Sequence, residues 1–211
     1  MSERTPTRRG VIRAGAGVCS VGLAGCRTAS SDAPLTESFE SDLDGWTTHS
    51  DIGPEEPEEA FEWAIERSET QAADGDWSLE VFTEGDHDDG TAWATTELEP
   101  PADADSFSVS FQAWSQSESF NILRNVVAYL GPEEPREEGD FPDPGGNSSA
   151  IPDAPYGGLR EPLHLSEGWH EYSFDWDPDS VPETLFFAVG VSVVWESDAT
   201  HYLDDIGIDS A

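Results

Sequence analysis

The chain has 211 residues and a formal net charge of −36, with 45 acidic side chains against nine basic ones, all of them arginine. Phosphate binding depends on Lys and Arg, so this charge argues against nucleic acid as a partner, and an anionic membrane surface would repel the chain as well. An acidic chain with few aromatic residues would be disordered, but eight Trp, ten Phe and four Tyr supply the large apolar side chains of a core.

The first 26 residues carry a pattern typical of exported proteins. Arg8 and Arg9 precede a weakly apolar run over residues 14–25, which is too short for a bilayer because a spanning helix needs about 20 apolar residues. The arginine pair resembles a twin-arginine export signal. Leu23-Ala24-Gly25-Cys26 resembles a lipobox, in which the cysteine is lipidated and becomes the first mature residue. The alternative is a disordered basic N-terminus.

This resemblance implies three parts. We expect a signal peptide over residues 1–25, the lipidated Cys26 with a flexible tether over residues 26–36, and a single domain over residues 37–211. The lipid would hold the protein at the extracellular face of the cell membrane. Because Cys19 lies in the signal and Cys26 carries the lipid, we expect no disulfide bond in the domain.

The domain reads as a series of short β-strands. In residues 107–114, apolar Phe107, Val109, Phe111 and Ala113 alternate with Ser108, Ser110, Gln112 and Trp114, which is the period of two typical of a strand. Further strands are predicted over residues 39–41, 45–48, 61–66, 78–83, 91–98, 125–130, 170–176, 184–195 and 201–208. No convincing helical periodicity is present, so the sequence predicts an all-β fold, an antiparallel β-sandwich of jelly-roll type.

Two segments read as long loops. Residues 50–60 are rich in Glu and Pro, and residues 131–162 are rich in Pro and Gly. A loop as long as the second is usually either functional or disordered, and the sequence leaves both open. Its Asn147-Ser148-Ser149 triplet matches a glycosylation sequon, a pattern that is common by chance.

The charge itself suggests a salty environment. Such self-repulsion destabilises a compact state in dilute buffer, but at about 1 M salt the Debye length falls to about 3 Å and screens most of it. The acidic surface, the absence of Lys and the twin-arginine signal together resemble secreted proteins of extremely halophilic archaea.

Four motifs in chain order carry a family resemblance. They are Glu37-Ser-Phe-Glu-Ser-Asp-Leu-Asp-Gly-Trp46, Ala73-Asp-Gly-Asp-Trp-Ser-Leu-Glu-Val81, Gly168-Trp-His-Glu-Tyr172 and His201-Tyr-Leu-Asp-Asp-Ile-Gly-Ile208. Their order resembles the galactose-binding-like β-jelly-roll, the fold of many carbohydrate-binding modules, over nearly all of the domain. The resemblance implies a fold rather than a particular ligand, because this fold hosts lectins, adhesion modules and enzyme accessory domains.

The same resemblance implies a structural calcium ion where the first and last strands meet. The matching positions are Glu40 and Asp205, with Asp204 and Asp74 beside them. Calcium takes six to eight oxygen ligands, and Asp204 and Asp205 lie within an apolar strand, where an ionised carboxylate is costly unless it is paired or bound to a metal. The alternative is that these are solvated carboxylates, since acidic residues are abundant in this chain.

A sugar-binding face is the second expectation. Sugar sites combine an aromatic platform with amide, guanidinium and carboxylate groups for the hydroxyls. Two strands offer this combination: Trp114 shares a face with Gln112, and Tyr129 shares one with Asn125, next to Arg124. Trp93, which shares its face with Thr95 and Glu97, is a further candidate. The alternative is that these tryptophans fill the core.

Catalysis has the weakest support. The five histidines show no metal-ligand spacing, and the Gly-x-Ser-x-Gly motif is absent. Glu171 and Asp175 on one strand face could pair for glycoside cleavage. We therefore expect a non-catalytic carbohydrate-binding module that holds polysaccharide or a glycosylated partner. The alternatives are an adhesion protein that binds another protein, with loop 131–162 supplying the contact, and a polysaccharide hydrolase or lyase.

Overall fold

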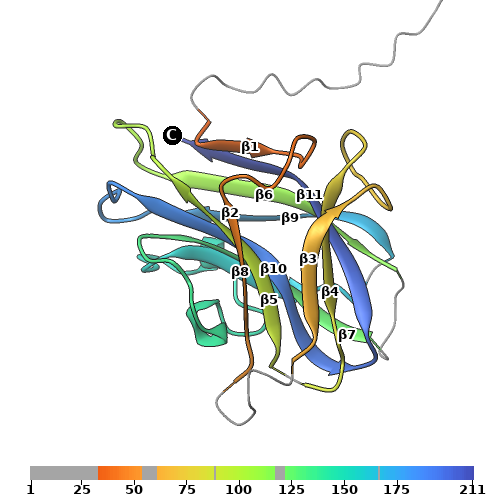
Figure 1. Ribbon diagram of the computed structural model, residues 1–211. Coiled ribbons are helices and arrows are strands. Elements are labelled where there is room, and N and C mark those ends of the chain that lie inside the picture. The colour runs from red at the N-terminus through yellow and green to blue at the C-terminus, as the bar shows by residue number, and fades with distance from the viewer. Residues whose placement is uncertain (1–32, 54–60, 88, 117–121, 166) are drawn as a thin grey trace, which may run out of the picture.

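The computed structural model describes residues 33–53, 61–87, 89–116, 122–165 and 167–211 (Figure 1). These segments form eleven strands and two 3-10 turns: β1 (Leu35–Glu37), β2 (Trp46–Asp51), β3 (Trp63–Ser68), β4 (Ser78–Thr83), β5 (Thr91–Leu98), β6 (Phe107–Ser115), β7 (Ile122–Gly131), η2 (Glu138–Asp140), η3 (Ser148–Ala150), β8 (Gly157–Pro162), β9 (Gly168–Trp176), β10 (Leu185–Glu196) and β11 (Ala199–Ser210). Among the described residues, no helix is long and apolar enough to cross a membrane. Cys26, Arg8 and Arg9 lie outside the described residues.

The strands form two antiparallel sheets packed face to face. A six-stranded sheet has the order β3-β4-β11-β6-β9, with β1 paired to β11, and a five-stranded sheet has the order β2-β5-β10-β7-β8. The predicted antiparallel sandwich is therefore confirmed. Consecutive strands β6 and β7 belong to opposite sheets, which separates side chains that are close in the sequence.

The core lies between the sheets and follows the predicted alternation. Phe107, Val109, Phe111 and Ala113 of β6 point inward and are buried, while Gln112 and Trp114 point outward. Strand β10 runs between β5 and β7, and its residues Leu185 to Val193, all buried except the partly buried Phe186, alternate between the core and the outer face of the five-stranded sheet. Its nearly continuous apolar sequence is explained by burial on both faces.

The start of the domain differs from the prediction. The strand expected over residues 39–41 is wrong: Phe39 has a φ of 56°, and its ring is fully buried in the core. The pairing strand is β1 at Leu35–Glu37, which begins inside the predicted tether and adds to β11. The left-handed turn at Phe39 is what allows the chain to leave the sheet edge while the ring enters the core.

The long segment after β7 is largely ordered, and it ends in a strand that the sequence did not predict. Residues 157–162 form β8, which pairs with β7. A Cβ at Gly157 would lie 2.6 Å from the Trp176 Cβ, and one at Gly158 would lie 2.6 Å from the Ala128 carbonyl oxygen. The two glycines are therefore packing requirements of a strand, although they read as turn residues.

Candidate ligand-binding faces

The outer face of the six-stranded sheet carries a row of side chains with one residue per strand. Tyr202 of β11 lies opposite Glu80 of β4 on one side and opposite Trp114 of β6 on the other, and Trp114 lies opposite Trp169 of β9. We call Tyr202, Trp114 and Trp169 the aromatic row. Neighbouring strands are about 4.8 Å apart, so the three aromatic residues occupy adjacent positions across the sheet.

The aromatic row is partly open and has polar groups beside it. Trp114 and Trp169 are half-buried, and Trp114 packs edge-on against the Tyr202 ring at 5.4 Å between centroids. Gln112 and Glu171 form the neighbouring cross-strand pair on the same face. Burial and the nearby Glu80 carboxylate raise the pKa of Tyr202, so its hydroxyl stays protonated and able to donate.

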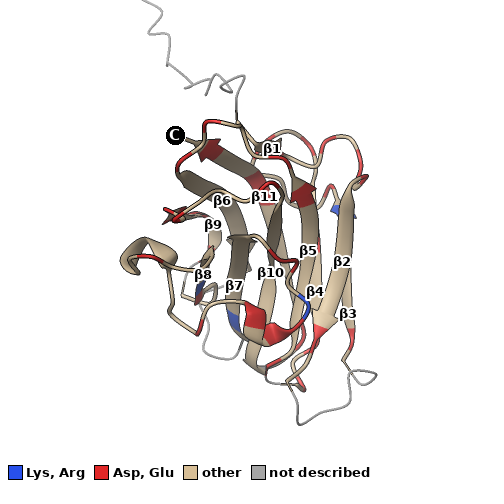
Figure 2. Cartoon of the chain, turned by 90° about the vertical axis from the view of Figure 1, so that its left-hand side faces the viewer, with Lys and Arg blue, Asp and Glu red and all other residues tan. Residues whose placement is uncertain are grey.

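The outer face of the five-stranded sheet is covered by residues 132–156, which we call the strap. Beneath it lies a second apolar cluster that includes Trp93, Val127 and Tyr129 of the sheet and Phe141 of the strap. Phe141 packs edge-on against Trp93, with 5.3 Å between centroids. Figure 2 shows this side of the molecule, with acidic residues spread over loops and strand ends and few basic ones.

Polar contacts fasten the strap to the sheet. The Arg160 guanidinium of β8 forms an ion pair with Glu138 of η2. The Glu138 backbone N–H donates to the Asp51 carboxylate at 2.7 Å. At the far end, Asn147 donates to the Glu161 carboxylate at 2.9 Å and to the Ser173 carbonyl at 3.1 Å. The strap therefore joins the edges of both sheets.

A cavity of about 840 Å³ lies at the edge of the strap. Three aromatic rings line it, those of Tyr129, Tyr156 and Phe186, together with acidic residues of the strap and Arg136. Burial raises the pKa of Tyr129 to about 12 and raises that of Tyr156. Both phenols therefore stay neutral hydrogen-bonding groups at any ordinary pH.

The six residues predicted to bind a sugar do not form one site. Trp114 and Gln112 share the open face of the six-stranded sheet, whereas Asn125, Tyr129 and Trp93 lie on the covered face of the other sheet. Trp93 is fully buried and Asn125 is 6% exposed. Both are therefore largely shielded from solvent, and Tyr129, which is 4% exposed, borders the cavity.

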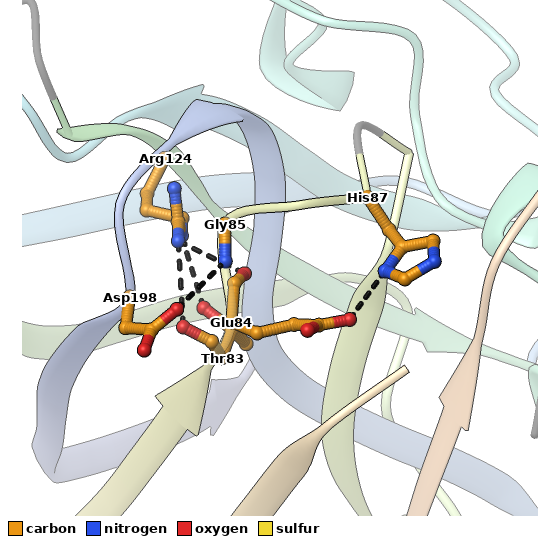
Figure 3. A network of polar contacts seen from close by, with 6 residues as sticks. All are labelled: Thr83, Glu84, Gly85, His87, Arg124 and Asp198. Carbon is orange, nitrogen blue, oxygen red and sulfur yellow. Dashed lines mark hydrogen bonds and ion pairs between the residues drawn. The ribbon is translucent and has the colours of Figure 1, made fainter. Parts of the chain in front are cut away.

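Arg124 is a correction to the predicted site, because its side chain points into the sandwich (Figure 3). It is fully buried and donates to Thr83 Oγ1 at 2.9 Å and to the carbonyl oxygens of Glu84, Trp195 and Ser197 at 2.9 to 3.1 Å. Burial lowers its pKa to about 10, which the nearby Asp198 carboxylate partly opposes. Arg124 therefore joins strand ends of the two sheets and does not face a ligand.

The turn that contains His87 is held by contacts of Glu84 and Asp198, which lie next to Arg124. The His87 ring contacts the Glu84 carboxylate, and the Gly85 N–H donates to Asp198 at 3.3 Å (Figure 3). The Glu84 side chain is buried and engaged with His87. These contacts give the turn that contains His87 a structural role.

Two of the four acids of the expected calcium site, Glu40 and Asp204, bind backbone N–H groups through their carboxylates. Glu40 Oε1 accepts the N–H groups of Asp76 and Trp77, both at 2.8 Å. Asp204 Oδ2 accepts those of Ala73 and Asp74 at 2.7 and 2.9 Å, and its Oδ1 accepts that of Asp205. No group of three or more acidic, His or Cys side chains able to hold a metal occurs in the described part of the chain. The carboxylates of Glu40 and Asp204 therefore hold residues 73–77 through hydrogen bonds, and calcium binding here stays a prediction.

The carboxylate pair considered for catalysis comes from positions that lie far apart along one strand. Glu171 and Asp175 lie four residues apart on β9, about 13 Å at about 3.3 Å per residue. Glycosidases hold their two carboxyl groups about 5 to 9.5 Å apart. Asp175 also accepts a hydrogen bond from Ser108 at 2.7 Å.

Several residues of these faces were missed in the sequence. Tyr202 and Trp169 lie in the family motifs, and the alternation of residues 168–172 does place Trp169 and Glu171 on one face. Their meeting with Trp114 depends on strand register, for which the sequence has no local signal. The fold of the long segment after β7 brings Tyr156 of the strap to the sheet and places Phe186 and Arg160 against the strap.

No family model and no curated protein sequence matches the chain, whereas solved structures do match it. A family 61 carbohydrate-binding module in complex with β-1,4-galactotriose is 13% identical, with a TM-score of 0.53, over 85% of this chain and 99% of that chain. A structure described as showing the promiscuous specificity of carbohydrate-binding modules of the β-sandwich superfamily is 17% identical, with a TM-score of 0.55. The match covers 86% of this chain and 64% of that one, so this chain spans less than two thirds of its length. At these identities the similarity shows a shared fold.

Proposed function

We propose that this protein is a non-catalytic carbohydrate-binding module that holds polysaccharide, or the glycans of a glycosylated partner, on the open face of its six-stranded sheet. It works at the extracellular face of the cell membrane, exported through its twin-arginine signal and anchored by a lipid on Cys26. The fold it shares with carbohydrate-binding modules is consistent with this role but does not specify the ligand.

The aromatic row is the observation that carries the proposal. The flat faces of Trp114 and Trp169 are half-buried, so they are held in place by packing and still accessible. An aromatic ring stacks against the C–H face of a sugar, while Gln112 and Glu171 beside it offer a donor and acceptors for sugar hydroxyls. The result is the combination of an apolar platform and convergent polar groups that ligand sites require.

The charge of the open face limits the class of polysaccharide that it can bind. Glu66 and Glu80 lie opposite each other at one end of the row, and Glu171 lies beside the other end. Carboxylates repel an anionic ligand and accept hydrogen bonds from hydroxyl groups. The open face is therefore suited to an uncharged polysaccharide.

Replacement of the two indoles tests the proposal. In titration calorimetry against neutral oligosaccharides at about 1 M salt, where the Debye length is about 3 Å, Trp114→Ala and Trp169→Ala should each weaken binding roughly tenfold, or about 1.4 kcal/mol. Trp195→Ala is the matched control, because Trp195 is 54% exposed on β10 of the other sheet. Equal affinities for all three variants and the wild type would remove the aromatic row from the site.

The same samples separate the rival functions. Release of reducing ends or unsaturated sugars would identify a hydrolase or lyase. Capture of a partner that persists after its glycans are removed would identify a protein-binding adhesion module.

For the anchor, Cys26→Ser should move the protein from the membrane fraction to the medium, and a membrane-bound variant would contradict the lipid anchor.

A further inference from the structure

The strap covers a surface whose chemistry differs from that of the core. Among the described residues, six side chains have a buried nitrogen or oxygen atom without a hydrogen-bond partner, and five of them lie on the covered face: Thr91, Trp93, Thr95 and Arg160, together with His49, which lies opposite Trp93 and stacks on its ring. The first three alternate along β5, so they point the same way, and Arg160 lies opposite Val127 of the cluster under the strap. Apart from His49, which is partly buried, each is at least nine-tenths buried.

A surface that serves only to pack against a loop would be apolar. Leaving a buried hydroxyl, indole N–H or guanidinium N–H without a partner is unfavourable, because the group has lost its hydrogen bonds to water. The opposite face of the same sheet has Ala92, Ala94, Val126 and Val189 pointing into the core. The covered face therefore has the row of unpaired polar groups that a polar ligand would satisfy.

Arg160 indicates the charge of that ligand. The Nε and Nη2 groups of an arginine lie on one edge of the guanidinium and together bind a carboxylate through two parallel hydrogen bonds. Here Nη2 donates to Glu138 and to Ser192 Oγ, while Nε has no partner. Glu138 therefore fills half of a two-pronged carboxylate site.

We propose that the covered face is a second glycan-binding site, specific for uronate-bearing saccharides, and that the strap keeps it closed by placing Glu138 where the ligand carboxylate binds. The ligand carboxylate takes both Nε and Nη2 of Arg160, and its hydroxyls pair with Thr91, Thr95 and the Trp93 N–H. Binding displaces η2 and the Phe141 ring from the sheet. The closed strap lowers the apparent affinity by the fraction of molecules that are open.

An uncharged sugar fits this site less well than the open face. If a neutral ligand displaced Glu138, the buried guanidinium would lose its counter-charge, which is strongly unfavourable. The open face has the opposite character, since carboxylates flank its aromatic row. The two faces would therefore select glycans of different charge.

The test uses oligogalacturonate as the acidic probe and a neutral oligosaccharide for comparison, with the full chain at about 1 M salt to screen the net negative charge. Glu138→Gln weakens the fastening of the strap and should raise the affinity for oligogalacturonate about tenfold. Glu133→Gln is the matched control, because Glu133 lies on the same strap with its side chain exposed and should change nothing. Arg160→Lys in the Glu138→Gln background keeps the positive charge but loses the fork, and should cancel the gain.

Hydrogen exchange at residues 138–141 gives an independent measurement. In the wild type, saturating oligogalacturonate should speed exchange there, while the neutral probe should leave it unchanged. The proposal is overturned if no oligogalacturonate binding is measured, if Glu138→Gln binds no better than Glu133→Gln, or if exchange slows on binding. It is independent of the open-face function, because Trp114→Ala should leave oligogalacturonate binding intact.

Discussion

Two of the arginines in this protein stabilise the fold by donating hydrogen bonds to backbone carbonyl groups. Arg67 donates to the carbonyls of Phe39 and Glu40 at 2.6 and 2.9 Å and stacks over Trp77, and Arg124 donates to several carbonyls at the end of the sandwich. With nine basic residues in the whole chain, these sites are ones where a positive charge meets backbone oxygens at strand ends and turns. A guanidinium suits them because it offers five donors in a planar arrangement.

His201 predicts how stability responds to acid. It is fully buried beside Arg124, donates from one ring nitrogen to the Trp114 carbonyl, and burial lowers its pKa to about 4. The unfolded chain therefore binds a proton below pH 6.5 that the folded chain refuses until about pH 4. The free energy of unfolding should fall by about 3 kcal/mol across that window, at about 1.36 kcal/mol per pKa unit.

Urea unfolding at pH 7, 5.5 and 4.5 measures this effect when His201→Gln is compared with the wild type. Asp204 acts in the opposite sense, because burial raises its pKa and its protonation at low pH favours the folded state. Since Asp204 is present in both proteins, its contribution cancels in the difference between them, which isolates His201. Parallel pH dependences for the two proteins would contradict the assignment.

At the scale of elements, the turn before β4 is held by two carboxylates, one just after β1 and one on β11, that accept its backbone N–H groups. Glu40 and Asp204 bind the turn before β4 from two sides. Gly75 in this turn has a φ of +68°, and a Cβ there would lie 2.3 Å from Glu40 Oε1. The turn and the carboxylate therefore depend on each other.

Glu40→Ala should lower the free energy of unfolding by about 2 kcal/mol, because it removes an ionised acceptor shared by two N–H groups. Glu62→Ala, at an exposed position before β3, is the control and should change it by less than about 0.5 kcal/mol. Calcium binding at this turn stays a prediction of the family resemblance. A melting temperature that rises with calcium in the wild type but not in Glu40→Ala would support it, and the contacts of Glu40 and Asp204 lead us to expect no rise.

At the scale of the whole molecule, the net charge of −36 sets the conditions for folding. Acidic residues occur throughout the loops and strand ends on the side shown in Figure 2, so each one repels many others. This repulsion opposes the compact state and is screened by salt.

The melting temperature should therefore rise by more than 10 °C between about 0.1 M and 2 M KCl, where the Debye length falls from about 10 Å to under 3 Å. Scanning calorimetry measures the shift. Sucrose at matched osmolality is the control, because it favours burial without screening charge. Equal shifts in salt and sucrose would mean that charge repulsion is not what limits stability.

The sequence by itself determined the strands and the direction of many side chains, because alternation is a local property of two neighbouring residues. Phe107, Val109, Phe111 and Ala113 point inward as predicted, and Trp114 and Gln112 share the outer face. It misplaced the first strand and missed β8, where Phe39 adopts a left-handed conformation and where two glycines are required by close packing.

Only the tertiary structure decided which faces meet. Strands β6 and β7 belong to different sheets, so Trp114 and Arg124 are separated, while strand register brings Trp114 between Tyr202 and Trp169. The strap then buries Trp93 and engages Arg160. Pairing and coverage depend on contacts between residues far apart in the chain, and no local pattern encodes them.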